Sequence, residues 1–152
     1  MCYSAMTVAR YLIERSGGNK TPMQLNKLTY IAHGWGLAIY NEPLIVEEIE
    51  AWKYGPVIPV LYHEFKRFGG NTVPHRPILE TSSILDKDKE LLEKIIDVYG
   101  HWSGLQLSAK THEKGTPWYQ TRKWYNTVNP VIPNKLIKEY YIKKAKQSVD
   151  GN

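Results

Sequence analysis

The sequence predicts a mainly α-helical domain of the α+β class: a single compact bundle of about six or seven helices, with a small β-hairpin or short sheet around residues 44–54. Three observations lead to this prediction. Apolar residues recur at helical spacing along most of the chain. Two segments open with the residue pattern of a capping box. Only residues 44–54 combine β-branched residues with the alternation of apolar and polar side chains that is typical of a half-buried strand.

The first two helices have clear start signals. A first helix is expected over residues 4–15, capped by its first residue and followed by a glycine pair. The second helix begins at the capping box of residues 21–24, in which the Thr21 hydroxyl and the Gln24 side chain each serve free backbone N–H groups. Its apolar stripe includes Trp35, which we expect to be a core residue.

Residues 50–69, EAWKYGPVIPVLYHEFKRFG, predict a strand, a sharp turn and a helix. Gly55–Pro56 is expected to end the strand, because proline keeps the residue before it out of the helical region. Pro59 then stands at the first position of a helix. The apolar residues that we place on one face of this helix are Leu61, Tyr62, Phe65 and Phe68.

The second half of the chain is expected to be helical after a polar loop over residues 71–83. Helices are predicted from Asp86 or Asp88 to Tyr99, from the capping box at 103–106 to about His112, as a brief turn capped by Thr116–Pro117, and from Pro133 onward. We assign residues 1–146 to a single domain and residues 147–152 to a polar C-terminal tail.

The net charge of +5 is unevenly distributed. Residues 110–146 contain nine Lys or Arg and two Glu, so this segment carries +7 and the other residues together carry −2. Such a segment suits an acidic partner, either nucleic acid or protein. A solvated, lysine-rich last helix explains the same distribution equally well, so both interpretations stay open.

The composition predicts a soluble protein of the cytoplasm. The single cysteine permits no internal disulfide, which suits a reducing compartment. The first residues lack the basic and apolar regions of a signal peptide. No apolar stretch approaches the roughly 20 residues that span a bilayer, so we expect no membrane partner.

The sequence offers no catalytic or metal-binding constellation. His63-Glu64 and His112-Glu113 begin like the zinc-binding helix of metalloproteases, but neither is followed by the second histidine. The glycine pairs resemble helix terminators and not a phosphate-binding loop. We therefore expect a protein that is not an enzyme and that needs no metal and no cofactor.

Aromatic residues with polar groups are abundant: eleven Tyr and five Trp stand beside two Phe. Tyr and Trp are favoured at interfaces, because one side chain offers both apolar area and a hydrogen-bonding group. Six of them lie in or beside breaks between elements: Trp52, Tyr54, Trp118, Tyr119, Trp124 and Tyr125. Each one alone fits partial burial in the core, whereas the set, flanked by Lys and Arg, suggests a recognition surface.

Four stretches together resemble the Panacea domain, the SocA-like and GepA-like group of phage-associated proteins that act as antitoxins. They are LNKLTYIAHGWGLA (25–38), PLIVEEIEAWKYGPVIPVLYHEFKRFG (43–69), LLEKIIDVYGHWSGLQLSAKTHEKGTPW (91–118) and NPVIPNKLIKEYY (129–141). The resemblance runs from about Tyr3 to Ile142. Its most specific motifs are Glu50-Ala51-Trp52 with Tyr54-Gly55-Pro56-Val57, and Thr111-His112 with Pro117-Trp118. Where relatives more often have alanine just before the arginine, this chain has Thr121.

The resemblance implies a non-enzymatic antitoxin of a bacterial or phage system that binds and blocks a toxin encoded by an adjacent gene. Two other roles stay open: an adaptor that delivers the toxin to a Clp-type protease, and a DNA-binding autoregulator of its own operon. A homodimer is a further alternative. Against the regulator, no helix-turn-helix pair with a base-reading face is recognisable.

Combining the resemblance with the aromatic pattern gives a set of candidate residues. The toxin-binding candidates are Trp52, Tyr54, His112, Trp118, Arg122 and Lys123. The residues assigned to the scaffold are Trp35, Gly55, Pro56, Tyr62, Phe65 and Pro117. The Trp-Tyr-Gly-Pro block is interpreted as a rigid joint that fixes a strand against a helix and presents a partner-binding face.

Overall fold

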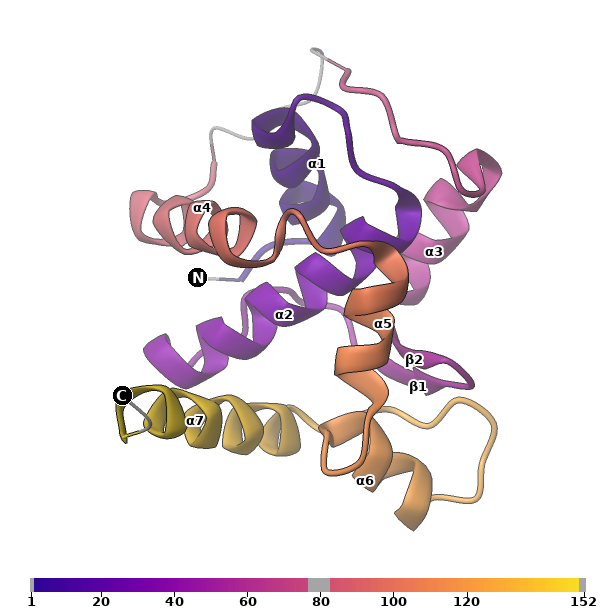
Figure 1. Cartoon of the computed structure of the whole chain (residues 1–152), viewed down its shortest axis with the longest axis vertical. Helices are drawn as coiled ribbons and strands as arrows, with labels where there is room; N and C mark the ends of the chain where they lie inside the picture. The colour runs from indigo at the N-terminus through magenta and orange to yellow at the C-terminus, as the bar shows by residue number, and fades with distance from the viewer. Residues whose placement is uncertain (1, 77–82, 151–152) are drawn as a thin grey trace.

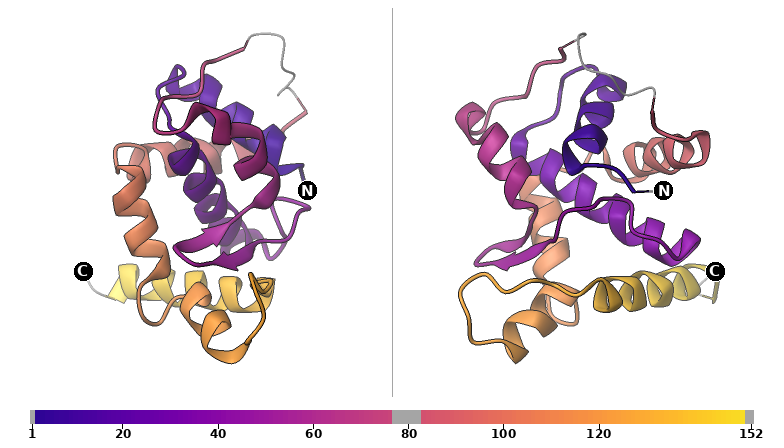
Figure 2. Two further views of the ribbon diagram at one scale, coloured as in Figure 1. Left: turned by 90° about the vertical axis from the view of Figure 1, so that its right-hand side faces the viewer. Right: turned by 180° about the vertical axis from the view of Figure 1, so that it is seen from behind.

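Helix α2 (Pro22–Tyr40) is the central element of the fold. The computed structural model describes residues 2–76 and 83–150. Five described helices pack against α2: α1 (Ala5–Ser16), α3 (Pro59–Phe65), α4 (Asp86–Tyr99), α5 (Gly104–His112) and α7 (Asn134–Asp150). In Figures 1 and 2, α7 runs along one side of α2, whereas α1 and α4 lie on the opposite side. Because it is surrounded, α2 is buried at every position from 25 to 34, and not along a single stripe.

Glycine allows α2 and α7 to approach closely. A Cβ atom on Gly34 of α2 would lie 2.2 Å from Cε2 of Tyr141 of α7, so no larger residue fits here without a shift. Tyr141 is buried, and its ring packs edge-on against Trp35 with the centroids 5.2 Å apart. Trp35 itself is half-buried and packs against the core. The last helix is therefore fixed to the centre of the molecule.

The helix starts agree with the sequence signals. The side chain of Ser4 accepts a hydrogen bond from the backbone N–H of Thr7, at the start of α1. The two predicted capping boxes are both formed, at Thr21–Gln24 before α2 and at Ser103–Gln106 before α5. Together with a small antiparallel sheet, these helices confirm the predicted mainly α-helical bundle.

The sheet is a hairpin of β1 (Glu50–Trp52) and β2 (Gly55–Val57). Trp52 pairs with Gly55, so residues 53–54 form a two-residue turn. The prediction that Gly55–Pro56 ends the strand is wrong, because both residues belong to β2. Proline is tolerated there because β2 is an edge strand, whereas the free side of β1 bonds to residues 130–132. Residues 44–46 contribute only a bridge between Tyr3 and Ile45.

Helix α3 buries Leu61 and Phe65, and continues into the 3₁₀ turn η1 (Lys66–Phe68). Tyr62, predicted on the same face, is 43% exposed, which corrects that placement. Leu61 and Phe65 are four residues apart and share the inner stripe, while a residue next to Leu61 points about 100° away from it. Tyr62 accordingly lies over the hairpin.

Two helices in the C-terminal half are longer than the sequence predicts. The brief turn after Thr116 is a helix of two turns, α6 (Pro117–Trp124), with Pro117 buried at its first position. Helix α7 extends to Asp150, into the range 147–152 that was assigned to a polar tail. Residues 77–82 of the predicted loop lie outside the described residues. None of the helices in the described ranges is long and apolar enough to cross a membrane.

Candidate partner-binding site

A cavity of about 420 Å³ opens between the first turns of α2, the hairpin turn and α3, and we call it the hairpin groove. Its walls carry the rings of Trp52, Tyr54 and Tyr62, and two lysines, Lys53 and Lys66, stand among them. Tyr54 is 70% exposed at the tip of the hairpin. The left-hand view of Figure 2 faces the side of the molecule on which the hairpin lies.

The aromatic walls are held by local contacts. The rings of Trp52 and Tyr62 meet edge to face, with centroids 5.0 Å apart. The indole N–H of Trp52 donates to Oε1 of Glu50 at 2.8 Å. Lys53 and Lys66 lie near the faces of Tyr54 and Tyr62, with Nζ to centroid distances of 5.3 and 6.0 Å. The groove therefore presents the packed rings of Trp52 and Tyr62 and the exposed ring of Tyr54, with a positive rim.

Side chains from α5 and α6 hold the hairpin by hydrogen bonds to its main-chain oxygens. We call these side chains (Trp118, Arg122 and Ser108), together with Lys27 and Asn26 of α2, the brace. Trp118 Nε1 donates to the carbonyl oxygen of Trp52 at 2.5 Å. Arg122 donates from one guanidinium nitrogen to the carbonyl oxygen of Ala51 at 3.1 Å. Ser108 of α5 donates to the carbonyl oxygen of Tyr54 at 2.9 Å. These contacts satisfy carbonyl groups of a strand and a turn that are too short to be stable alone.

Two polar residues of α2, Lys27 and Asn26, complete the brace by bonding to main-chain atoms of Pro56 and Ile58. Lys27 is buried, and its Nζ donates to the carbonyl oxygen of Pro56 at 2.6 Å. Burial lowers the pKa of Lys27 to about 8. Asn26 holds Ile58 with two bonds, accepting from its N–H at 2.9 Å and donating to its carbonyl oxygen at 3.2 Å.

Gly55 is the point at which the brace and the hairpin come closest. Its φ of +132° lies in a region that favours glycine. A Cβ atom at this position would lie 2.9 Å from Nζ of Lys27, so a larger residue would push against the buried ammonium. The Gly-Pro pair is therefore fixed both by its backbone conformation and by the lysine beneath it.

The structure separates the six toxin-binding candidates into three groups. Trp52 and Tyr54 line the hairpin groove. Trp118, Arg122 and His112 lie behind the hairpin; His112 is half-buried, contacts the carbonyl oxygen of Ser108 and packs against the ring of Trp118 at 5.3 Å. Lys123 is exposed and is not among the residues that line the groove. Of the residues assigned to the scaffold, Gly55, Pro56, Phe65 and Pro117 are buried, whereas Tyr62 lines the groove.

Sequence reasoning missed Asn26, Lys27 and Ser108. The first two stand between Leu25 and Leu28, where a one-sided helix would turn them toward solvent. They are buried because α2 is surrounded, which no local pattern shows. One signal was available: a polar pair inside an apolar stretch, which needs buried partners if the helix is central.

The site gives no indication of metal chemistry. Among residues 2–76 and 83–150, no group of three or more His, Cys, Asp or Glu side chains could hold a metal ion.

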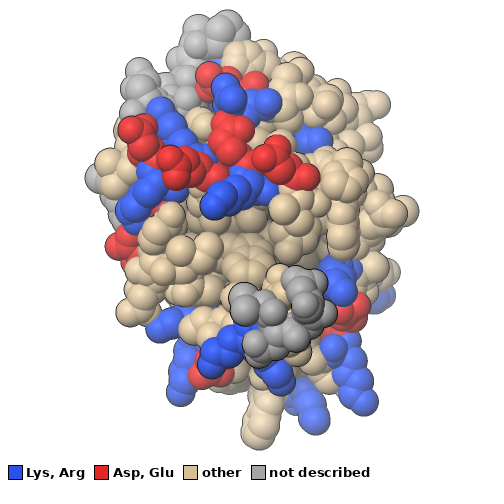
Figure 3. Space-filling view, turned by 60° about the vertical axis from the view of Figure 1, so that its left-hand side comes forward, with Lys and Arg blue, Asp and Glu red and all other residues tan. Residues whose placement is uncertain are grey.

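The charged side chains are distributed unevenly over the surface. On the face shown in Figure 3, acidic and basic side chains alternate in the upper half, and Lys and Arg predominate in the lower part. In the α1–α4 region, Arg15 pairs with Glu93 at 2.5 Å.

Comparison with known proteins identifies the family. Residues 25–119, which run from the first half of α2 into α6, match the family described as Antitoxin SocA-like, Panacea domain. A curated relative, Antitoxin SocA of Caulobacter vibrioides (strain NA1000 / CB15N), is 34% identical over 127 residues, which cover 75% of this chain and 68% of the relative. No solved structure matches the chain. The two matches show that the chain belongs to the Antitoxin SocA-like, Panacea domain family.

Proposed function

We propose that the protein is the antitoxin of a toxin–antitoxin pair, and that it neutralises its toxin by direct binding in the hairpin groove. Family membership and the curated relative support the antitoxin role. The observation that carries the choice of surface is the groove of about 420 Å³ walled by Trp52, Tyr54 and Tyr62. Binding energy at protein interfaces is concentrated in a few aromatic and arginine side chains that fill or line such pockets.

The shape and charge of the groove indicate what it would accept. Its volume falls within the range of roughly 300–1,000 Å³ that is typical of ligand pockets. Its walls are mainly apolar, while Lys53 and Lys66 make the rim positive. An apolar or aromatic side chain of the toxin, flanked by Asp or Glu, would complement both properties.

The brace behind the hairpin supports tight binding. Ordering a loop or a side chain at an interface costs about 0.5–1.5 kcal/mol for each immobilised side chain. Here the turn is already held by bonds to the carbonyl oxygens of Trp52, Tyr54 and Pro56. The backbone of the hairpin is therefore preorganised, and less of the interaction energy is lost on ordering it.

The test compares two tyrosines. The protein is co-expressed with the product of the adjacent gene, and survival and co-purification are measured for Tyr54→Ala and Tyr125→Ala. Both tyrosines are exposed, at 70% and 52%, but only Tyr54 lines the groove. We expect Tyr54→Ala to weaken binding at least about tenfold, since hot-spot residues contribute 2 kcal/mol or more, and Tyr125→Ala to bind like the wild type.

Three outcomes would contradict the proposal. Equal binding by the two variants would place the interface elsewhere. Disappearance of the toxin only in the presence of a Clp-type protease would favour the adaptor role over direct blocking. Salt-dependent binding to the DNA upstream of the gene, without any complex with the neighbouring product, would favour the autoregulator.

A further inference from the structure

The hairpin groove contains more positive charge than its rim alone supplies. Three lysines line it: Lys53 and Lys66 are exposed, whereas Lys27 is only 4% exposed, in the wall that α2 contributes. No Asp or Glu of the described chain lines the same groove. None of the three lysines forms an ion pair with a described residue. The groove thus combines aromatic walls with three positive charges and no negative charge.

Lys27 has hydrogen-bonding capacity that the folded chain does not use. An ammonium group carries three N–H donors. One of them bonds to the carbonyl oxygen of Pro56, and Nζ has no second partner among the described residues. The two other buried polar side chains of the groove, Asn26 and Ser108, are bonded to main-chain atoms. Lys27 is therefore the buried group of the wall that is able to bind a further acceptor.

The charge of Lys27 also lacks compensation. Burial lowers the pKa of Lys27 to about 8, and no neighbouring carboxylate counters this shift. At pH 7 the ammonium form still predominates at such a pKa. Buried charges in proteins are normally paired, because an isolated charge is costly to remove from water. The unpaired ammonium group therefore indicates that a negative group from outside the chain completes the site.

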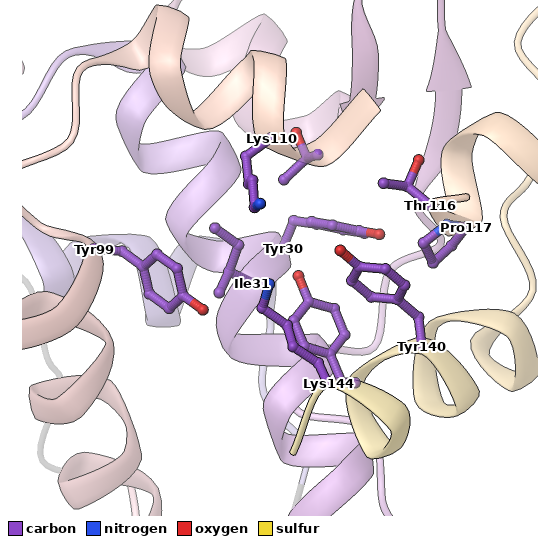
Figure 4. A pocket seen from close by; sticks show the side chains of 10 residues that line it. Tyr30, Ile31, Tyr99, Lys110, Thr116, Pro117, Tyr140 and Lys144 are labelled. Carbon is purple, nitrogen blue, oxygen red and sulfur yellow. The ribbon is translucent and has the colours of Figure 1, made fainter. Parts of the chain in front are cut away.

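A smaller cavity between α2, α5 and α7 shows that lysines alone do not make such a site. Figure 4 shows this cavity, which Lys110 and Lys144 line. Its volume of about 20 Å³ leaves room for a water molecule, and Lys110 already has a carboxylate, that of Glu113, at 3.4 Å. The hairpin groove differs in both respects: its volume is about 420 Å³, and its lysines have no carboxylate within the described chain.

We propose that the hairpin groove receives the C-terminal residue of the toxin, with an apolar side chain against Trp52 and Tyr62 and the terminal carboxylate on the ammonium group of Lys27. This inference rests on the proposed antitoxin function. A carboxylate matches an ammonium donor through a charge-assisted hydrogen bond. Only the last residue of a chain carries an apolar side chain and a free carboxylate on the same Cα atom. Acidic residues before it can pair with Lys53 and Lys66 at the rim.

The first test uses the unmodified protein and small probes, without toxin. N-acetyl-tryptophan imitates a C-terminal residue, and N-acetyl-tryptophanamide has the same side chain without the charge. Backbone amide NMR shifts are followed as each is added. We expect saturable shifts clustered at residues 26, 27, 52 and 54 with the acid, and at least about tenfold weaker binding of the amide, since a bond to a charged group is lost. Equal affinities, or shifts elsewhere, overturn the proposal.

A third probe distinguishes a chain terminus from an internal acidic residue. N-acetyl-glutamyl-tryptophanamide carries a carboxylate on a side chain and none at its end. We expect it to bind less tightly than N-acetyl-tryptophan, because its carboxylate and its indole ring belong to different residues. Binding as tight as that of the acid, or tighter, would assign the groove to an internal Asp or Glu and would overturn the assignment to a terminus.

The titration of Lys27 shows directly whether the carboxylate reaches it. Lysine side-chain carbon shifts are measured against pH with and without N-acetyl-tryptophan. We expect the pKa of Lys27 to rise when the acid binds, because a neighbouring carboxylate favours the ammonium form, and not to rise with the amide. Other titratable side chains nearby are Lys53 and Lys66 in the groove and His112 beside Gly55. Saturable binding with an unchanged pKa of Lys27 would place the carboxylate at the rim and overturn the proposal.

Matched variants complete the assignment. Lys27→Gln removes the charge but keeps an N–H donor, and it should weaken binding of the acid at least about tenfold while leaving binding of the amide unchanged. Lys143→Gln removes an exposed charge outside the groove and should change neither affinity. Equal losses in the two variants would mean general attraction and would overturn the site. If Lys27→Gln is unfolded by circular dichroism, the titration of Lys27 in the unmodified protein decides.

The toxin itself provides the last test. The product of the adjacent gene is extended at its C-terminus by a short Gly-Ser segment, and co-purification is measured. We expect the extended toxin to bind at least about tenfold more weakly; an unchanged complex would overturn this inference. The two proposals fail separately, because the probes need no toxin. A complex that forms although N-acetyl-tryptophan does not bind contradicts this inference alone, whereas binding of the probe without any complex contradicts the antitoxin proposal.

Discussion

His33 illustrates how a single buried ring joins distant parts of the chain. It has no exposed surface, and its Nδ1 accepts hydrogen bonds from the backbone N–H groups of Leu44 and Ile45, both at 3.3 Å. Its Nε2 lies 2.9 Å from Oδ1 of Asn134, so Nε2 carries the proton and donates. Because Nδ1 must accept, the ring is neutral in the folded protein, and burial lowers its pKa below 6.5.

This arrangement predicts acid sensitivity. In the unfolded chain His33 takes up a proton as pH falls below 6.5, whereas in the folded chain it stays neutral until the pH reaches its lowered pKa. The stability that His33 contributes above pH 6.5 is therefore lost as the pH falls toward that lowered pKa. The free energy of unfolding should fall by up to about 1.4 kcal/mol per pH unit from this residue. Urea unfolding from pH 7 to pH 5 measures it. His33→Gln should flatten the slope and the exposed His101→Gln should not; parallel slopes in all three proteins would refute the assignment.

At the scale of elements, the contact between α2 and α7 depends on Gly34, whereas a second glycine of the same helix, Gly36, faces other neighbours. A Cβ atom on Gly34 would lie 2.2 Å from the ring of Tyr141. A Cβ atom on Gly36 would meet ordinary contacts, with Leu44 at 3.5 Å and Leu91 at 3.6 Å. Both glycines lie inside the same helix, so the backbone effect of alanine is the same at the two positions.

Alanine substitution at these positions should have opposite effects. Gly36→Ala should be neutral or stabilise by up to about 1 kcal/mol, because alanine favours the helix. Gly34→Ala should destabilise by about 1–3 kcal/mol, because the ring of Tyr141 must move. Thermal unfolding of the two variants against the wild type checks both values. Equal melting temperatures would mean that α7 adjusts freely and is not fixed by this contact.

The elements also show what a sequence can predict. Caps at Ser4, Thr21 and Ser103 were predictable because each depends on residues three apart. The second strand was missed because proline usually ends a strand. Pro56 is acceptable in β2 because, within the described residues, no further strand pairs with the outer side of β2. The face of Tyr62 was missed because adjacent helical positions point about 100° apart, so a helix such as α3, which packs on one side, buries Leu61 and Phe65 and leaves Tyr62 outside that stripe.

At the scale of the whole molecule, the two surfaces considered from the sequence lie on different elements. The hairpin groove is formed by α2, the hairpin, α3 and the η1 turn with the glycine after it, with one residue from α5. The lysine-rich segment lies mainly on α7, which packs along the opposite part of α2. Sequence could name the groove aromatics Trp52 and Tyr54, but not the brace. Its bonds join residues 29 to 71 positions apart, and only the folded chain brings them together.

A pair of charge reversals distinguishes the two surfaces. Lys135→Glu combined with Lys146→Glu alters exposed positions of α7 that do not line the groove. We expect toxin neutralisation to change less than about threefold, because rim and distant charges contribute little to affinity. Survival on toxin co-expression measures this, with circular dichroism as the check on folding. A loss of neutralisation would identify α7 as the interface. Arg122→Glu would be a poorer probe, since Arg122 also holds the backbone of Ala51.

The bonds that brace the hairpin end on atoms that every amino acid possesses. Trp118, Ser108 and Lys27 bind the carbonyl oxygens of residues 52, 54 and 56, and none of these three bonds uses a side chain of the hairpin. Residues 53 and 54 can therefore be exchanged while the frame that displays them stays the same. Mutation can alter recognition here without a matching repair in the core. The hairpin is thus a position where descendants of one antitoxin could diverge toward new partners, and where a designed library of turn sequences would retain the fold.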